Sequence, residues 1–252
     1  MARTIIVGDT HGCLNELKGL IDKVGYDPTC GDRVILVGDM VDRGPDSCGV
    51  VRFARENKFE SVCGNHDNKF IRYHGHEVKR LASLDAPRPY KNPMRFNEDK
   101  HQTYNGLTQE DHDWLASLPD FILLESLKTL VVHAGVMPGR DPLGQPGNVY
   151  RHCRYVSDKD LSLVNLDTST YAKPEGSTFW ADLYDGGLNV VHGHHVIDME
   201  NPKVTTTKTG SGRVFGIDTG CCFGGRLTAA IFNEDGGHEF VQVAASKVYY
   251  TK

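Results

Sequence analysis

The stretch GDMVDRG at residues 38–44 directly follows the apolar run VILV at 34–37. An apolar run that ends in Gly-Asp is typical of a buried strand whose carboxyl end opens into a loop at the edge of a sheet. Five further phrases follow apolar runs in the same way: GDTHG at 8–12, GNHD at 64–67, HAG at 133–135, GHH at 193–195 and DTG at 218–220. We therefore expect several loops to bring their polar side chains together at one sheet edge.

The first part of the chain alternates between strand and helix patterns. Asp9, Asp39 and Asn65 are 30 and 26 residues apart, which is about the length of one strand–helix–strand unit each. The amphipathic pattern of 13–25 predicts a helix that ends at a glycine, and 48–57 predicts a shorter helix. The three strands that precede Asp9, Asp39 and Asn65 are therefore expected to be parallel.

The rest of the chain is less regular. Residues 73–120 are polar and 137–180 form a second irregular stretch, so we interpret both as cap-like insertions beside the site. Within the first stretch, Thr108 and Asp111 match a capping box at the start of a helix. The short apolar runs of 188–250 predict strands, which we expect to form an antiparallel second sheet.

Composition excludes several classes of protein. Apolar and charged contents of 39% and 24% are ordinary for a soluble protein, and 252 residues favour a single domain over 1–252. A formal net charge of −5 argues against extended nucleic-acid binding, but not against a small phosphorylated ligand beside bound metals. No signal-peptide pattern or membrane-length apolar run is found, so no membrane association is expected. Seven scattered Cys without a CxxC pair favour a reducing, cytoplasmic location.

The first two loops carry carboxylates suited to metal binding. Asp9 and His11 are separated by one residue, so both can reach one cation; the alternative is a turn Asp beside a surface His. Asp39 can bridge two cations, and the alternative for its motif is a solvated Asp/Arg turn. Arg43 offers a planar fork suited to phosphate oxygens.

The third loop combines a neutral ligand with an acid. Asn65 offers an amide oxygen, and His66 could protonate a leaving alkoxide as a general acid. Asp42 could orient His66 and hold it charged. The alternative for an Asn-His-Asp string is a helix cap.

His133 and His194 each end an apolar strand close to a glycine, Gly135 and Gly193 respectively. A single His in such a place is more often a hydrogen-bonded core residue, but two of them downstream of the other motifs favour metal ligation. Two cations carry +4, whereas Asp9, Asp39 and a bridging hydroxide carry about −3, so the remaining charge suits a phosphate anion. Paired cations about 3.5–4 Å apart also acidify a bridging water into a nucleophile. The pattern predicts a phosphate-ester hydrolase.

The phrases GDTHG, GDMVDRG, GNHD, HAG and GH, in this order over residues 5–228, resemble those of calcineurin-like metallophosphoesterases of the phosphoprotein phosphatase branch. The His-Asp pair in GNHD, FWADLYDG at 179–186 and IDTGCCFGGRLTA at 217–229 are similar to bacterial and phage members. These include diadenosine tetraphosphatases and small serine/threonine phosphatases.

The resemblance implies an α/β fold, a four-layer α/β/β/α sandwich of two mixed sheets. It also implies a centre of two divalent metal ions, usually manganese, with iron or zinc as alternatives. Asp39 would bridge the metals, and the implied ligands are Asp9, His11, Asp39, Asn65, His133 and His194. His66 would be the acid, Asp42 its support and Arg43 a phosphate-binding residue. The family generally presents a second phosphate-binding arginine before GH. Arg154 is the first candidate for this role and Arg151 the second.

These observations lead to a two-metal phosphoesterase acting on dinucleoside polyphosphates, on phosphoproteins or on both. An alternative within enzymes is an RNA-cap or inorganic polyphosphate hydrolase. An alternative of another class is a non-catalytic module that binds phosphate or a partner. The expected partner is a phosphorylated small-molecule or protein substrate.

Overall fold

The computed structural model describes residues 2–164 and 172–251; residues 165–171, part of the second stretch expected to form an insertion, lie outside the described residues. The first of its two large sheets has the strand order β13-β12-β1-β2-β3. Strands β1, β2 and β3 are parallel, as the motif spacing predicts, and β12 pairs antiparallel with both β1 and β13. The bounds are β1 Arg3–Val7, β2 Arg33–Leu36, β3 Glu60–Ser61, β12 Arg226–Asn233 and β13 His238–Ala244.

The second large sheet has the order β10-β11-β9-β5-β4. Strands β5, β9 and β11 are parallel, whereas β4 and β10 pair antiparallel at the two edges. The expectation of an antiparallel second sheet from 188–250 is therefore wrong, because β12 and β13 join the first sheet. The three parallel strands are buried along their length apart from the first residues of β9 and β11, as expected for strands covered on both faces. The bounds are β4 Phe121–Leu124, β5 Thr129–Val132, β9 Asn189–His192, β10 Lys203–Thr206 and β11 Arg213–Gly216.

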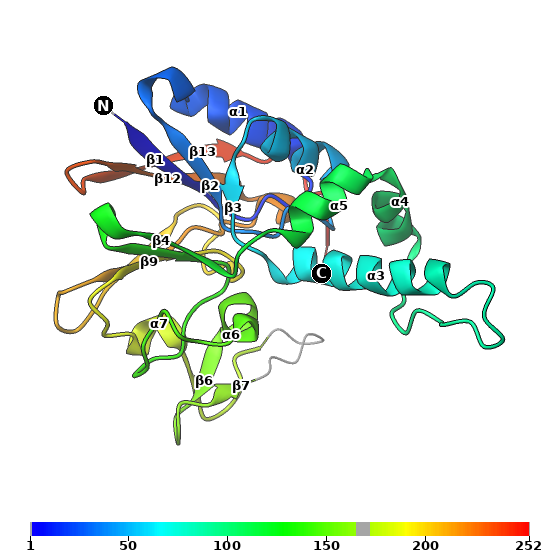
Figure 1. The fold of residues 1–252 in the computed structure, drawn as a ribbon. Helices are drawn as coiled ribbons and strands as arrows, with labels where there is room; N and C mark the ends of the chain where they lie inside the picture. Colours follow the sequence, from blue (N-terminus) through cyan, green and yellow to red (C-terminus); the bar gives the residue numbers. More distant parts are fainter. Residues whose placement is uncertain (1, 165–171, 252) are drawn as a thin grey trace.

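The two sheets pack face to face through side chains of both, including Ile6 and Ile35 of the first and Val131, Val191 and Phe215 of the second. Helices α1 Leu14–Val24 and α2 Ser47–Glu56 cover the outer face of the first sheet (Figure 1). On the opposite side, α6 Gly147–His152 and α7 Trp180–Leu183 pack on the second sheet. The expected four-layer sandwich of two mixed sheets is confirmed.

Further helices lie beside the sandwich. Helix α3 spans Asn65–Ala82 and extends away from the sheets, so the first polar stretch begins inside a helix (Figure 1). Helix α5, Gln109–Ala116, packs against α2 and α3. The predicted capping box is present, since Thr108 accepts from Asp111 N and the Asp111 carboxylate accepts from Thr108 N. The remaining elements are α4 Glu98–Gly106, β6 Tyr155–Ser157, β7 Leu163–Val164, β8 Ser177–Phe179 and the 3-10 turns η1 Pro28–Cys30, η2 Glu125–Leu127 and η3 Cys221–Phe223.

Within the described part of the chain, no helix combines the length and apolar character needed to cross a bilayer.

Candidate metal centre

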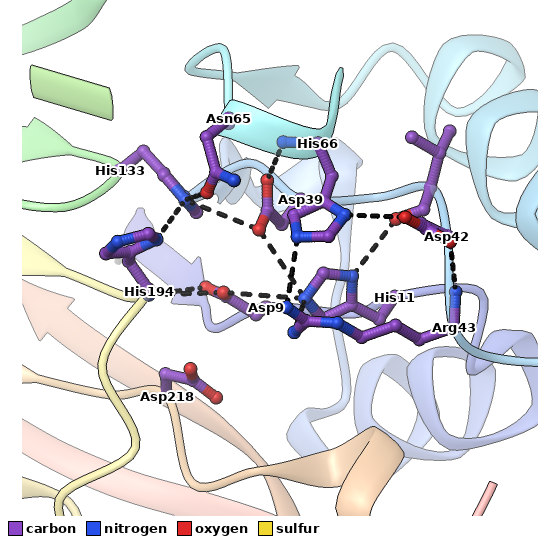
Figure 2. Close-up of polar contacts among 12 residues, drawn as sticks. Asp9, His11, Asp39, Asp42, Arg43, Asn65, His66, His133, His194 and Asp218 are labelled. Carbon is purple, nitrogen blue, oxygen red and sulfur yellow. Dashed lines mark hydrogen bonds and ion pairs between the residues drawn. The ribbon is translucent and has the colours of Figure 1, made fainter. Parts of the chain in front are cut away.

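Loops after β1, β2, β5 and β9 meet at one place together with the N-terminus of α3 (Figure 2). Several non-glycine residues there have a left-handed backbone, which costs on the order of 1 kcal/mol each and is typical of functional sites. They are His11 (φ 40°), Asp39 (φ 50°), Asp42 (φ 76°), Arg43 (φ 72°) and His194 (φ 64°). The turn geometry at these positions directs successive side chains into one site.

The loops approach so closely that two positions tolerate only glycine. A Cβ atom at Gly64 would overlap the backbone and carboxylate of Asp39, and one at Gly193 would overlap the carboxylate of Asp9. Gly64 and Gly193 therefore allow the GNHD loop to pack directly on Asp39 and the GHH loop to pack directly on Asp9.

The first half of the site consists of Asp9, His11 and Asp39. The Nδ1 of His11 donates to the carbonyl of Val41 at 3.0 Å, which leaves Nε2 with a lone pair. This Nε2 lies 3.5 Å from Asp39 Oδ2 and 4.0 Å from Asp9 Oδ2. Burial, and then the nearby Arg43, hold the pKa of His11 well below its usual value. His11 is therefore a neutral imidazole in the form that binds a metal.

The second half consists of His133, His194 and Asn65. The Nδ1 of His133 donates to the carbonyl of Val37 at 2.8 Å. Its Nε2 lies 2.9 Å from Asn65 Oδ1, 3.1 Å from His194 Nδ1 and 3.4 Å from Asp39 Oδ2. Asp39 Oδ2 therefore lies between an imidazole of each half, so it is the carboxylate oxygen shared by the two halves.

The donor set fits divalent cations. With neutral imidazoles, the facing atoms of the second half all carry lone pairs, so positive charge is needed among them, whereas in the first half Arg43 Nη1 already lies 2.7 Å from His11 Nε2. Burial lowers the pKa of His133, but the carboxylates of Asp39 and Asp9 outweigh it and raise that pKa to about 9. The same electrostatic demand is met by metal ions, and carboxylate, amide and imidazole ligands suit manganese, iron or zinc.

Asp218, from the DTG phrase, lies near this centre, as expected for a strand-end phrase, although it was not among the expected ligands (Figure 2). Burial and then the Asp218 carboxylate raise the pKa of Asp9 well above its usual value. The two backbone bonds that Asp9 accepts from His194 N, both 3.1 Å, oppose this shift. The carboxylates thus add to the need for positive charge.

His66 projects from the first turn of α3 toward the metal-ligand residues. Its Nδ1 bonds Asp42 Oδ2 at 2.8 Å, and Lys100 Nζ bonds the same carboxylate at 2.8 Å. Burial would raise the pKa of Asp42, but His66 and Lys100 outweigh it and hold that pKa well below its usual value. Asp42 is thus an ionised partner that orients His66. Lys100 had no motif that could identify it, because it lies in the polar stretch of 73–120.

The helix-cap interpretation of GNHD also holds, for its last residue. Asp67 accepts from Gly64 N at 3.1 Å, which closes the cap of α3, and from Met40 N at 2.9 Å. The string therefore begins a helix and also places Asn65 and His66 in the site.

Two arginines lie beside the candidate ligands. Arg43 places Nη1 2.7 Å from His11 Nε2 and Nη2 3.0 Å from His66 Nε2. Arg154 Nη2 donates to the His194 carbonyl at 2.8 Å, and Arg154 lines, together with Arg43, the cleft that opens over the candidate ligands. Arg151 instead pairs with Asp120. The cleft has a volume of about 530 Å³, and its lining includes Arg43, Lys69, Lys100, Arg154, Phe223 and Tyr250.

A family model described as calcineurin-like phosphoesterase matches residues 2–237. The chain belongs to this family. It is therefore a hydrolase of phosphoric esters or anhydrides, and family membership implies divalent metal ions. The resemblance inferred from the ordered sequence motifs is confirmed.

Relatives of this calcineurin-like phosphoesterase include tetraphosphatases. Bis(5'-nucleosyl)-tetraphosphatase PrpE (asymmetrical) of Bacillus subtilis strain 168 is 31% identical over 97% of this chain and 95% of the relative. The symmetrical bis(5'-nucleosyl)-tetraphosphatase of Pectobacterium atrosepticum is 28% identical over 89% and 90%. Among solved structures, one named "Crystal structure of a putative diadenosine tetraphosphatase" has a TM-score of 0.72 at 27% identity and covers 96% of this chain and 93% of that one.

Proposed function

We propose that this phosphoesterase hydrolyses dinucleoside polyphosphates at a two-metal centre held by the six candidate ligands, with Asp39 shared between the metals. The observation that carries the metal assignment is the position of Asp39 Oδ2, 3.5 Å from His11 Nε2 and 3.4 Å from His133 Nε2. We assign manganese as the working metal, with iron and zinc as the other metals that suit these oxygen and nitrogen donors. When bound, two such cations polarise the phosphoryl group and lower the pKa of a coordinated water.

The side chains around the centre divide the remaining work. His66 donates a proton to the leaving oxygen from Nε2, because Asp42 holds its Nδ1. Arg43, whose fork bonds Nε2 of His11 and of His66 in this structure, would turn from both imidazoles to bind phosphoryl oxygens, and Arg154 would bind them from the side of His194. Burial of the ligand residues excludes water from their surroundings and strengthens each of these electrostatic contacts.

Two observations support a polyphosphate substrate over a simple monoester. The cleft lining includes Lys69 in addition to the two arginines, whereas Lys100 pairs with Asp42, so positive charge extends beyond the place of one phosphoryl group. Relatives that align with nearly the whole chain are named tetraphosphatases of dinucleosides.

A substrate panel tests this proposal. With manganese present, we expect kcat/KM for diadenosine tetraphosphate to exceed that for a phosphoserine peptide, capped RNA and inorganic polyphosphate about tenfold or more, since a tenfold difference needs only about 1.4 kcal/mol. The measurement is initial rates at equal concentration for all four substrates. A higher value for the phosphopeptide, capped RNA or polyphosphate would assign the enzyme to that substrate class instead.

The role proposed for Arg154 predicts a selective kinetic defect. Arg154→Ala should lower kcat/KM about tenfold, because a charge-assisted hydrogen bond contributes about 1.5–3 kcal/mol. Arg154→Lys should recover only part of the loss, because lysine lacks the planar fork. Metal content, measured by atomic emission, should not change.

Arg151→Ala is the matched control for this prediction. Arg151 is three residues away and pairs with Asp120. We expect kcat/KM of that variant to stay within about twofold of wild type. Arg154→Ala kinetics within twofold of wild type would show that the second phosphate-binding group lies elsewhere.

A further inference from the structure

The segment 246–251 that follows β13 folds back over the site and is fixed by named contacts. Ser246 donates from N and Oγ to Glu16 Oε1 at 2.9 and 2.8 Å, and the Tyr249 hydroxyl donates to the same oxygen at 2.7 Å. The backbone nitrogens of Tyr249 and Tyr250 both donate to the carbonyl of Cys222, at 3.0 and 2.9 Å. These bonds hold Tyr250 beside η3, at the edge of the metal cleft.

Tyr250 forms an aromatic pair with Phe223 of η3. Their ring centroids are 6.1 Å apart and the planes are inclined by 62°. Cζ of Arg43 lies over both rings, 5.2 Å from the Phe223 centroid and 5.9 Å from that of Tyr250. The pair therefore contacts the guanidinium of Arg43, which we assign to phosphate binding.

An apolar groove of about 450 Å³ adjoins this pair, and its lining consists of Val196, Ile197, Met199, Phe223, Val248, Tyr250 and Thr251. Several of these side chains are open to solvent, with exposed fractions of 43% for Ile197, 57% for Val248 and 44% for Tyr250. Phe223 and Tyr250 line both the groove and the metal cleft, so the two spaces adjoin at this aromatic pair. The groove volume lies in the range of small-molecule sites, and exposed apolar patches of this kind often mark binding surfaces.

We propose that Phe223, Tyr250 and the adjoining apolar groove bind a nucleobase while the phosphate chain of the same ligand passes Arg43 to the metal centre. This inference rests on the proposed function and deepens it. A nucleotide has an anionic chain at one end and a flat ring with apolar faces at the other. The basic cleft and the apolar groove, joined at the aromatic pair, match that order of charge and apolar surface. Stacking of a base on an aromatic ring also tolerates different bases.

The neighbouring cavity beside α4, about 480 Å³, is a weaker candidate for this ligand. Its lining is mostly polar, with Asp46 and Asp99 beside Arg43 and Lys100, and among the described residues Tyr250 is its one aromatic side chain, so it offers little apolar surface to a base. Acidic groups disfavour the approach of an anionic phosphate chain. The apolar groove has no acidic residue in its lining, so the observations favour the groove.

The test compares ligands that have the same phosphate chain length with and without a base. Inhibition constants of ATP and of inorganic tripolyphosphate are measured against nitrophenyl phosphate hydrolysis by the manganese-loaded enzyme. Tyr250→Ala should raise the ATP constant about tenfold, since stacking of one base contributes about 1–3 kcal/mol. The tripolyphosphate constant should change less than twofold. Tyr250→Phe keeps the ring and should retain the wild-type ATP constant. The matched control is Leu84→Ala, at an exposed apolar side chain in another part of the chain.

Two results would overturn the inference. An unchanged ATP constant in both Tyr250→Ala and Phe223→Ala would place the base elsewhere. Equal losses for ATP and tripolyphosphate would mean that the rings act only by positioning Arg43. Failure of the proposed function is distinguishable, because it would appear as a wild-type preference for another substrate in the panel, while the two inhibition constants can still be measured.

Discussion

Replacing Asp39 with asparagine should remove bound metal and phosphatase activity together. Asp39 Oδ2 lies 3.5 Å from His11 Nε2 and 3.4 Å from His133 Nε2, so it is the carboxylate shared by both halves of the site. The substitution keeps an oxygen that can accept from His66 N, as Asp39 Oδ1 does at 2.8 Å, but removes the negative charge. We expect kcat/KM to fall about 10³-fold, because bound cations supply several kcal/mol of transition-state stabilisation.

The measurement is metal content by atomic emission alongside kcat/KM for nitrophenyl phosphate. Chelation of the wild-type enzyme should abolish activity in the same way, and added manganese should restore it. Asp22→Asn, at an exposed position of α1, is the matched control and should retain both metal and activity. Two metals per chain in Asp39→Asn, or full activity in metal-free wild type, would contradict the shared-carboxylate assignment.

The sequence predicts those parts of the site in which one short stretch contains both the apolar run of a strand and the candidate ligand that follows it. An apolar run followed by Gly and Asp determines that Asp9 and Asp39 lie at strand ends, and the run LVV directly before His133 does the same for that residue. Parallel pairing brings the ends of β1 and β2 together in the first sheet and those of β5 and β9 together in the second, and the packing of the two sheets then joins these ends. Local chemistry similarly determines the cap of α5 at Thr108, since both capping bonds lie within one turn.

The partner of each strand is not a local property. The apolar runs of β12 and β13 predict strands, but the same alternation could have paired with either sheet. Strand β12 lies beside β1, with Ile231 opposite Ile5, although most of the chain separates the two strands in sequence. Such a pairing depends on the packing of distant segments, which explains why the antiparallel second sheet was a wrong prediction.

For the same reason, the motif residues could be predicted from the sequence, whereas the other groups at the site could not. Lys100, Phe223 and Tyr250 come from a polar stretch, a 3-10 turn and an extended segment, and only the fold brings them to the cleft. The choice between Arg151 and Arg154 likewise depended on a distant residue, because Asp120 pairs with Arg151.

Replacing His66 with asparagine should lower kcat about 10²–10⁴-fold, the usual contribution of a general acid. The imidazole is held through Nδ1 by Asp42 at 2.8 Å, and its Nε2 lies 3.0 Å from Arg43 Nη2 at the cleft. Asparagine keeps a polar side chain but cannot act as a general acid. His76→Asn, whose imidazole bonds Tyr90 instead, is the matched control and should keep wild-type kcat.

Metal content decides whether His66 acts as acid or ligand, because its ring also lies near His11 and Asp39. As an acid, His66 can be replaced without loss of the two metals, and the defect should depend on the leaving group. Nitrophenolate needs little protonation, so the loss of kcat should be much smaller for nitrophenyl phosphate than for an alkyl phosphate ester. A His66→Asn enzyme that lost metal, or that was impaired equally on both substrates, would place His66 among the ligands and would leave the proton of the leaving group to another residue.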